Sequence, residues 1–100
     1  MILERTLNIE KLEKASFILK ALAHPTRIEI VNILKEQGTL TVSEICYALD
    51  NMDQSLVSHH LSNMKSKGIL ECKRKGRHIF YSLRMHEVLT VLECMERCEI

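Results

Sequence analysis

Residues 53–65 combine short polar side chains with apolar ones at helical spacing. On a helix, short polar side chains near the N-terminus can reach base edges in the DNA major groove while apolar ones attach the opposite face. The expected outward residues are Gln54, Ser55, Ser58 and His59. The expected inward residues are Leu56, Val57, Leu61 and Met64. Farther along, we expect Ser62 and Lys65 to meet phosphates. A polar helix face that meets only solvent is the alternative.

A basic stretch follows this segment. Six Lys or Arg residues and one acid, Glu71, lie between residues 65 and 77, although the whole chain has 14 basic and 13 acidic residues. Three of the cations, Arg74, Lys75 and Arg77, surround Gly76. A cationic loop beside a groove-reading helix could lie along a sugar-phosphate backbone and gain affinity from counterion release. The two features together predict binding to double-stranded DNA.

Two thiols near the end of the chain could also do chemistry. Cys94 and Cys98 are four residues apart, so on a helix their Cβ atoms would lie about 5 to 6 Å apart. A relaxed disulfide needs about 3.5 to 4.5 Å, so an intrahelical bridge would require an unwound last turn. The pair could instead bind a thiophilic metal ion or bridge to a second subunit. Both could also be packing residues, as we expect for Cys46 and Cys72, and we assign no metal or other cofactor.

The residues that could read DNA require two short helices joined by a turn. Pro25 predicts the start of a helix that stops at Gln37-Gly38, after an amphipathic helix over residues 9–22. Thr41 and Glu44 match the capping box at a third helix. Residues 50–53 form a polar turn before the segment described above. This arrangement is a helix-turn-helix.

After these helical segments the sequence pattern becomes that of β-strands. Residues 69–74 and 77–83 predict two short strands, which Lys75-Gly76 would join as a hairpin. A last helix is expected from Met85 through Met95. The predicted fold is therefore mainly α with a small β-hairpin, in the order of four helices, a hairpin wing and a C-terminal helix.

Composition limits the function class. Hydrophobic residues make up 46% of the chain and aromatic residues 4%, which favours one aliphatic, helical domain over residues 1–100. No glycine-rich phosphate loop and no set of nucleophile and base is present, so we expect no enzyme. The N-terminus has no secretion signal and no stretch approaches the roughly 20 apolar residues of a membrane span. We therefore expect a cytoplasmic protein with reduced thiols.

Several motifs in order resemble the ArsR/SmtB family of winged helix-turn-helix repressors. Residues 21–28 (ALAHPTRI) look like the second-helix signature of that family, and residues 55–61 (SLVSHHL) look like its recognition helix. Residues 67–70 (KGIL), 74–77 (RKGR) and 79–83 (IFYSL) are similar to its wing. The resemblance covers roughly residues 12 to 92.

The resemblance implies a homodimeric repressor that binds operator DNA and dissociates when its inducer binds. It also implies that the first and last helices pack across the two-fold axis. The interface residues that we expect are Ile9, Leu12, Leu89, Leu92 and Met95, although each could instead close the core of one chain. Two recognition helices related by a two-fold axis would read a palindromic operator.

The sequence does not identify the inducer that would release the repressor. Family members often carry metal-binding thiolates in the helix before the recognition helix, where this chain has Thr41 and Ser43, and Cys46 alone cannot hold a soft metal. A second family position, on the last helix, corresponds here to Met85, Glu87 and Cys98, which do not make a usual zinc site. A sensor of redox state or thiophilic metals that uses Cys94 and Cys98 is therefore one alternative. A winged-helix module that binds proteins and not DNA is another.

Overall fold

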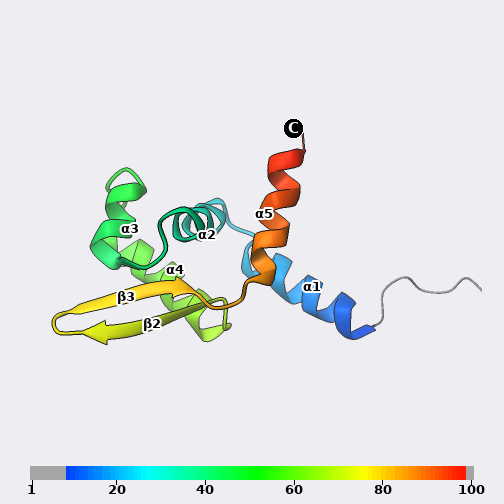
Figure 1. Ribbon diagram of the computed structural model, residues 1–100, viewed down its shortest axis with the longest axis horizontal. Coiled ribbons are helices and arrows are strands. Elements are labelled where there is room, and N and C mark those ends of the chain that lie inside the picture. The colour runs from blue at the N-terminus through cyan, green and yellow to red at the C-terminus, as the bar shows by residue number, and fades with distance from the viewer. Residues whose placement is uncertain (1–8, 99–100) are drawn as a thin grey trace, which may run out of the picture.

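The computed structural model describes residues 9–98, which form five helices and three strands (Figure 1). The elements are α1 (Ile9–Ala21), α2 (Pro25–Gln37), β1 (Leu40–Thr41), α3 (Val42–Ala48), α4 (Gln54–Ser66), β2 (Leu70–Lys75), β3 (His78–Leu83) and α5 (Glu87–Arg97). The predicted order of helices and hairpin is confirmed. Strand β1 is an element that the sequence did not indicate.

Local capping starts and stops α2 where the sequence predicts. His24 is extended, and its Nδ1 accepts a hydrogen bond from the backbone N–H of Thr26 at 3.3 Å, while Pro25 occupies the first turn. At the C-terminal end of α2, Gly38 has φ of +83°, a backbone conformation that residues with a Cβ atom rarely adopt. The chain therefore leaves α2 sharply.

The helix-turn-helix formed by α3 and α4 depends on two more caps. The predicted capping box is present: Thr41 Oγ1 accepts from the Glu44 N–H at 3.2 Å, and Glu44 Oε1 accepts from the Thr41 N–H at 2.9 Å. Between the helices, Asp50 and Asn51 both have positive φ, which Asp and Asn tolerate better than most residues. Asp53 then caps α4 by accepting from the Leu56 N–H.

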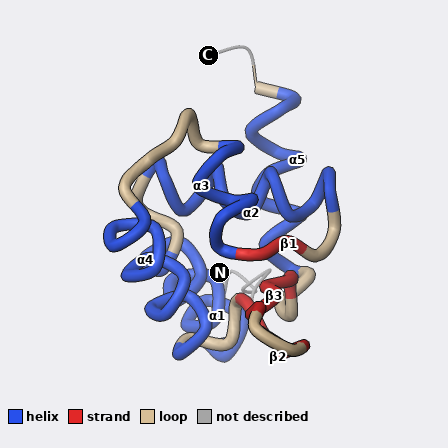
Figure 2. Tube along the Cα trace, turned by 90° about the vertical axis from the view of Figure 1, so that its left-hand side faces the viewer, coloured by secondary structure: helices blue, strands red, loops and turns tan. Residues whose placement is uncertain are grey.

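The strands form a small antiparallel sheet in the order β1-β3-β2. The prediction of a Lys75-Gly76 turn was wrong by one residue, because Lys75 pairs with His78 and the turn is Gly76-Arg77. Gly76 has φ of +60°, and a glycine at the first central position is typical of a type II′ turn. Leu40 pairs with Tyr81, which attaches the loop after α2 to the sheet (Figure 2).

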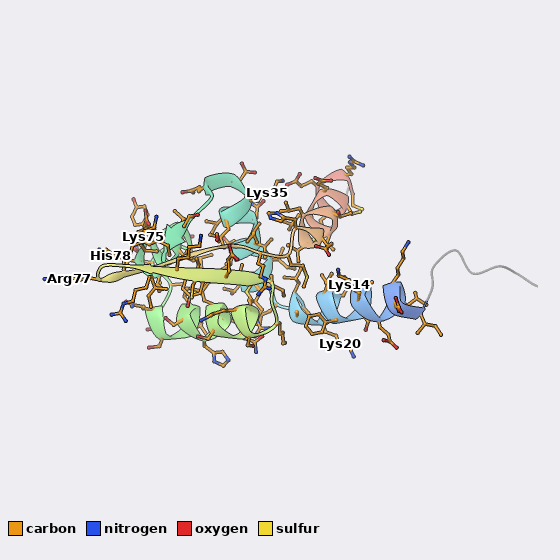
Figure 3. All side chains as sticks on the ribbon, turned by 60° about the horizontal axis from the view of Figure 1, so that its bottom comes forward. Lys14, Lys20, Lys35, Lys75, Arg77 and His78 are labelled. Carbon is orange, nitrogen blue, oxygen red and sulfur yellow. The ribbon has the colours of Figure 1, made fainter. Side chains whose placement is uncertain are left out.

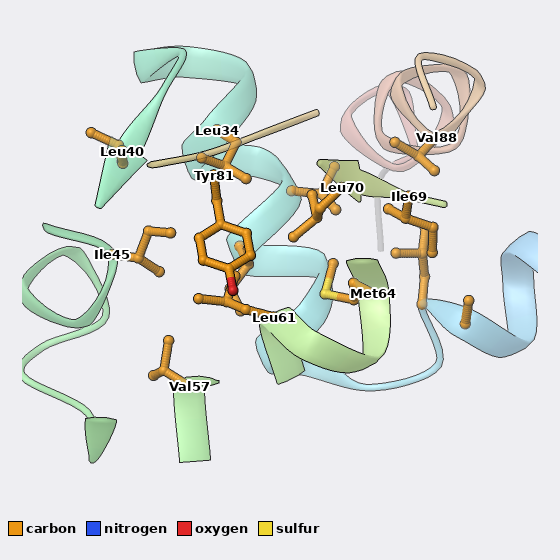
Figure 4. Packing of buried hydrophobic residues seen from close by; sticks show 14 of the residues in the cluster. Leu34, Leu40, Ile45, Val57, Leu61, Met64, Ile69, Leu70, Tyr81 and Val88 are labelled. Atoms are coloured by element: carbon orange, nitrogen blue, oxygen red, sulfur yellow. The ribbon is translucent and has the colours of Figure 1, made fainter. Parts of the chain in front are cut away.

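The core lies where α2, α3 and α4 meet the sheet and the first turns of α5. It is aliphatic, as the composition indicates, except for the ring of Tyr81 (Figure 4). The fully buried members with the largest side chains are Ile30, Val31, Ile45, Val57, Leu61, Met64, Ile69, Leu70 and Val88. Because α4 contributes three of them, its orientation is set by the packing of the whole domain.

Helices α1 and α5 bury fewer side chains in the core than α2 and α4 do. Helix α1 buries Ile18 and Ala21 near its C-terminal end, whereas Ile9, Phe17 and Leu19 are exposed, so the predicted apolar face is only partly covered.

Ion pairs connect α1 and α2 to α5: Lys14 pairs with Glu87, and Lys35 pairs with Glu96 at 3.1 Å. Lys35 and Glu96 are partly or mostly exposed, so water and salt screen their attraction and the pair adds little to stability. His86 precedes α5, and its side chain makes no capping hydrogen bond. Within residues 9–98, no helix is long and apolar enough to cross a bilayer.

The capping box supports a stability prediction. Replacement of Thr41 by alanine removes the acceptor for the Glu44 N–H and should lower the free energy of unfolding by about 1 kcal/mol. Urea denaturation at one fixed protein concentration measures this change. The exposed Ser43→Ala variant on the same helix is the control. A loss for Thr41→Ala no larger than that for Ser43→Ala contradicts the assigned role of the cap.

Candidate nucleic-acid interface

Helix α4 presents one buried and one open face. Val57, Leu61 and Met64 are fully buried, and His60 is 4% exposed, so the buried stripe repeats at three- and four-residue steps. Among the predicted DNA-reading residues, Ser58 is half-buried, and those exposed are Gln54, Ser55, His59, Ser62 and Lys65. Leu56 was predicted to face inward, which is wrong: it is 46% exposed because His60 completes the stripe instead.

The hairpin runs back along α4. Helix α4 has 13 residues and β2 has six, so both are about 20 Å long. They pack together, and only residues 67–69 separate them in the sequence. The hairpin tip therefore returns to the end of the molecule where α4 begins (Figure 3). This brings the predicted wing next to the first turn of the predicted reading helix.

The cations of the wing do not share one face. Side chains alternate along a strand, so Arg74 is on the same face of β2 as the buried Leu70 and half-buried Cys72, which is the face toward the core. Lys75 is on the other face, with its Nζ 6.0 Å from the centroid of the Phe80 ring. Arg77 is in the turn itself, and the label of Figure 3 places it at the outermost point. All three cations are exposed.

A cluster of two histidines and an arginine lies behind the open face of α4. Arg27 Nε donates to His60 Nδ1 at 3.0 Å, and Arg27 Nη1 donates to the carbonyl oxygen of Ala21 at 3.2 Å. The His24 ring lies against His60, with 4.4 Å between the centroids. Burial, followed by the nearby His24, Arg27 and His59, lowers the pKa of His60 below its ordinary value. His60 is therefore a neutral core residue near pH 7.

Sequence reasoning missed this role for His60. His59 is exposed and His60 is buried, because adjacent residues on a helix face different directions. The signal that could have found His60 is its spacing. It is three residues from Val57 and four from Met64, so it belongs to the apolar stripe.

The thiols are distributed as packing and surface residues. Cys46 is half-buried, and burial, with the nearby Asp53 carboxylate, raises the pKa of its thiol, which disfavours the thiolate that binds metals. Cys94 and Cys98 are exposed at the end of α5, where Cys98 leaves the helix with ψ of 128°. No group of three or more His, Cys, Asp or Glu side chains suited to a metal ion occurs in residues 9–98. The use of Cys94 and Cys98 as a sensor of redox state or metals stays a prediction.

The family model described as "Bacterial regulatory protein, arsR family" matches residues 24–71, which run from the cap of α2 into β2. The transcriptional repressor PagR of Bacillus anthracis is 37% identical over 84 residues, which cover 84% of this chain and 83% of PagR. The chain belongs to the ArsR family. Members of this family are transcriptional regulators and not enzymes, so the predicted class of DNA-binding regulator is confirmed.

Solved ArsR-family structures share the fold. The crystal structure of PagR matches with a TM-score of 0.77 at 35% identity, over 88% of this chain and 99% of PagR. HlyU of Vibrio cholerae, a transcriptional activator, matches with a TM-score of 0.79 at 29% identity, over 90% and 96% of the two chains. A homodimeric winged helix-turn-helix domain of a possible ArsR-family regulator from Mycobacterium bovis matches with a TM-score of 0.71 at 26% identity, over 96% and 87%. The winged-helix prediction is therefore confirmed.

The residues predicted for an ArsR-type dimer interface have different environments. Ile9, Leu12 and Met95 are exposed and Leu89 is half-buried. Leu92 is only 4% exposed and belongs to the core of the single chain, so it offers little area to a partner. A groove of about 520 Å³ opens between α2 and α5, and Ile28, Leu92 and Met95 are among its lining residues.

The alternation of side chains on β2 leads to a prediction for DNA binding. Arg77 at the tip and Arg74 on the face toward the core should each contact about one phosphate, so each alanine variant should reduce the slope of log affinity against log salt by about 1. Arg97→Ala is the matched control, because Arg97 is an exposed arginine at the end of α5, outside the helix and hairpin assigned to DNA. Fluorescence anisotropy with a labelled duplex over a salt series measures the slopes. Equal slopes for wild type and both arginine variants would exclude the wing from the interface.

Proposed function

We propose that the chain is a cytoplasmic, homodimeric repressor that binds operator DNA as a single winged-helix domain, residues 1–100. The observation that carries this proposal is the two-sided nature of α4: one face is fixed in the core, and the other is polar, exposed and adjacent to a cationic hairpin. Such a helix can enter the major groove without losing its packing.

The first turns of α4 read the sequence of the operator. Gln54, Ser55, Ser58 and His59 are the residues that we assign to base edges, because they are near the helix N-terminus, where recognition helices contact bases. Ser62 and Lys65 are one to two turns farther along and bind phosphates. Arg74, Lys75 and Arg77 hold the backbone beside the groove, which positions the helix without reading sequence.

A second copy of the chain covers the exposed apolar surface of α1 and α5. Ile9, Leu12 and Met95 are exposed large apolar side chains, and a surface of this kind usually marks an interface. The homodimeric domain from Mycobacterium bovis supports the same assembly for a chain of this fold. The two-fold axis places the recognition helices about 34 to 36 Å apart, so the operator is palindromic.

We assign repression to this chain because PagR, with 37% identity, is a repressor. HlyU, at 30% identity over 95 residues, is named as an activator, so the direction of regulation needs its own measurement. Release by an inducer completes the proposed cycle, and the inducer is not assigned.

The reading role of α4 has a direct test. Duplexes that the wild-type protein selects from a random pool serve as the operator probe. Gln54→Ala should lower affinity for the selected duplex by about tenfold and leave affinity for random duplex nearly unchanged, since one good base contact is worth about 1 to 3 kcal/mol. Gln37→Ala, an exposed glutamine at the end of α2, is the matched control. Equal losses on both duplexes would remove Gln54 from base reading.

In vitro transcription from a promoter that carries the selected site should fall when protein is added, and a rise would contradict repression.

The proposed dimer is tested by charge insertion. Leu12→Glu should convert the dimer to a monomer in sedimentation equilibrium, because a carboxylate would be buried without a partner. Leu56→Glu is the matched control: it introduces the same side chain at a leucine of nearly equal exposure, 46% against 45% for Leu12. A Leu12→Glu protein that sediments like the wild type would contradict the assigned interface.

A further inference from the structure

We propose that neutral His60 ties the recognition helix to the start of α2 through Arg27, and that acidification breaks this tie and weakens DNA binding. His60 is thus a positioning residue, with no contact to DNA of its own. The inference rests on the proposed function for its effect on DNA, whereas the tie itself is a property of the free protein.

Arg27 connects three segments that are separate in the sequence. Its Nε donates to His60 Nδ1 in α4 at 3.0 Å, and its Nη1 donates to the carbonyl oxygen of Ala21 at the end of α1 at 3.2 Å. Arg27 itself is in the first turn of α2. Arg27 therefore joins the α1–α2 junction directly to α4 by two hydrogen bonds, in addition to the apolar packing of α4 in the core.

The direction of this hydrogen bond sets the tautomer of His60. A guanidinium only donates and keeps its charge in proteins, so Nδ1 must present its lone pair to Arg27. The neutral ring then carries its proton on Nε2, which is buried without a hydrogen-bond partner. A second proton can bind only at Nδ1. Protonation of His60 and acceptance of the Arg27 hydrogen bond are therefore mutually exclusive.

The surroundings of His60 disfavour a charged ring. The side chain is 4% exposed, and the groups that act on it are His24 from the loop before α2, Arg27 from α2 and His59 from α4, each cationic or able to become so. A protonated ring would lie beside the permanent charge of Arg27 in a site with little water. The expected response is separation of the two side chains, which removes the hydrogen bond between α4 and the start of α2 and makes the position of α4 less exact, while its apolar face stays in the core.

The sign of the pH effect follows from the lowered pKa of His60. The stabilisation from neutral His60 is fully present above the pKa of an unfolded histidine, about 6.5, and is lost as the pH falls through that value to the lower folded pKa. Exposed His59 and His78 lie in the helix and hairpin that we assign to DNA, so a test must separate the effect of His60 from any effect of these two.

The test compares His60→Asn with His86→Asn, because His86 is exposed before α5 and outside the elements assigned to DNA. Asparagine Oδ1 lies near the position of histidine Nδ1 and accepts a hydrogen bond without titrating, so His60→Asn keeps an acceptor for Arg27 at every pH. Affinity for the selected duplex is measured by fluorescence anisotropy from about pH 8 to about pH 5.5 at constant salt. We expect the wild type to weaken by about fivefold relative to His60→Asn over this range, and His86→Asn to keep that decline. Superimposable pH profiles of wild type and His60→Asn overturn the switch.

Nitrogen-15 NMR of the histidine rings in the wild-type protein tests the tie without DNA and without a variant. The expected result is a His60 with Nε2 protonated and Nδ1 unprotonated at neutral pH that titrates below the ordinary histidine value. Protonation at Nδ1, or titration at or above about 6.5, overturns the proposal. If every protein fails to bind duplex DNA at about pH 8, the proposed function is wrong, and the NMR result still decides whether the tie exists.

Discussion

The arrangement of this protein depends on the burial of one face of α4. Val57, Leu61 and Met64 are inserted among α2, α3 and the sheet, so α4 cannot rotate without opening the core. Because that stripe takes most of the apolar residues of the helix, the remaining face is mainly polar, with Leu56 as its exposed apolar member. The connection to β2 is only three residues long, which forces the hairpin to lie beside the same helix. Packing and chain length therefore place together the residues that we propose for base reading and for backbone binding.

Patterns that are local in the sequence predicted most of the fold. The cap of α2, the capping box of Thr41 and Glu44 and the hairpin depend on neighbours within a few residues, and all are present. The missing information is long-range. Strand β1 exists because Leu40 pairs with a residue 41 positions away, and the exposure of Leu56 follows from burial of His60 by α2. No local pattern specifies these partners.

Local sequence patterns also indicated the candidate site, and long-range packing again limited what they could show. Composition alone, with a net charge of +1, gives no indication of a polyanionic ligand, whereas the cations from Lys65 to Arg77 do. The sequence could not show that Arg74 and Lys75 point to opposite faces of the hairpin, since this depends on which face of β2 meets the core. It also could not separate exposed apolar residues of α1 from core residues. That distinction depends on tertiary packing, and within residues 9–98 five of the eight exposed large apolar side chains lie on α1 and α5.

One surface, the open side of α4 together with the tip of the wing, is the proposed site for duplex DNA. Amide chemical-shift mapping of the isotope-labelled protein, titrated with a duplex that it has selected, locates this site. We expect the largest shifts in the first two turns of α4 and around Gly76, with small shifts in the exposed outer part of α1. Shifts concentrated on α1 and α5, with α4 and the hairpin unchanged, would rule out this site.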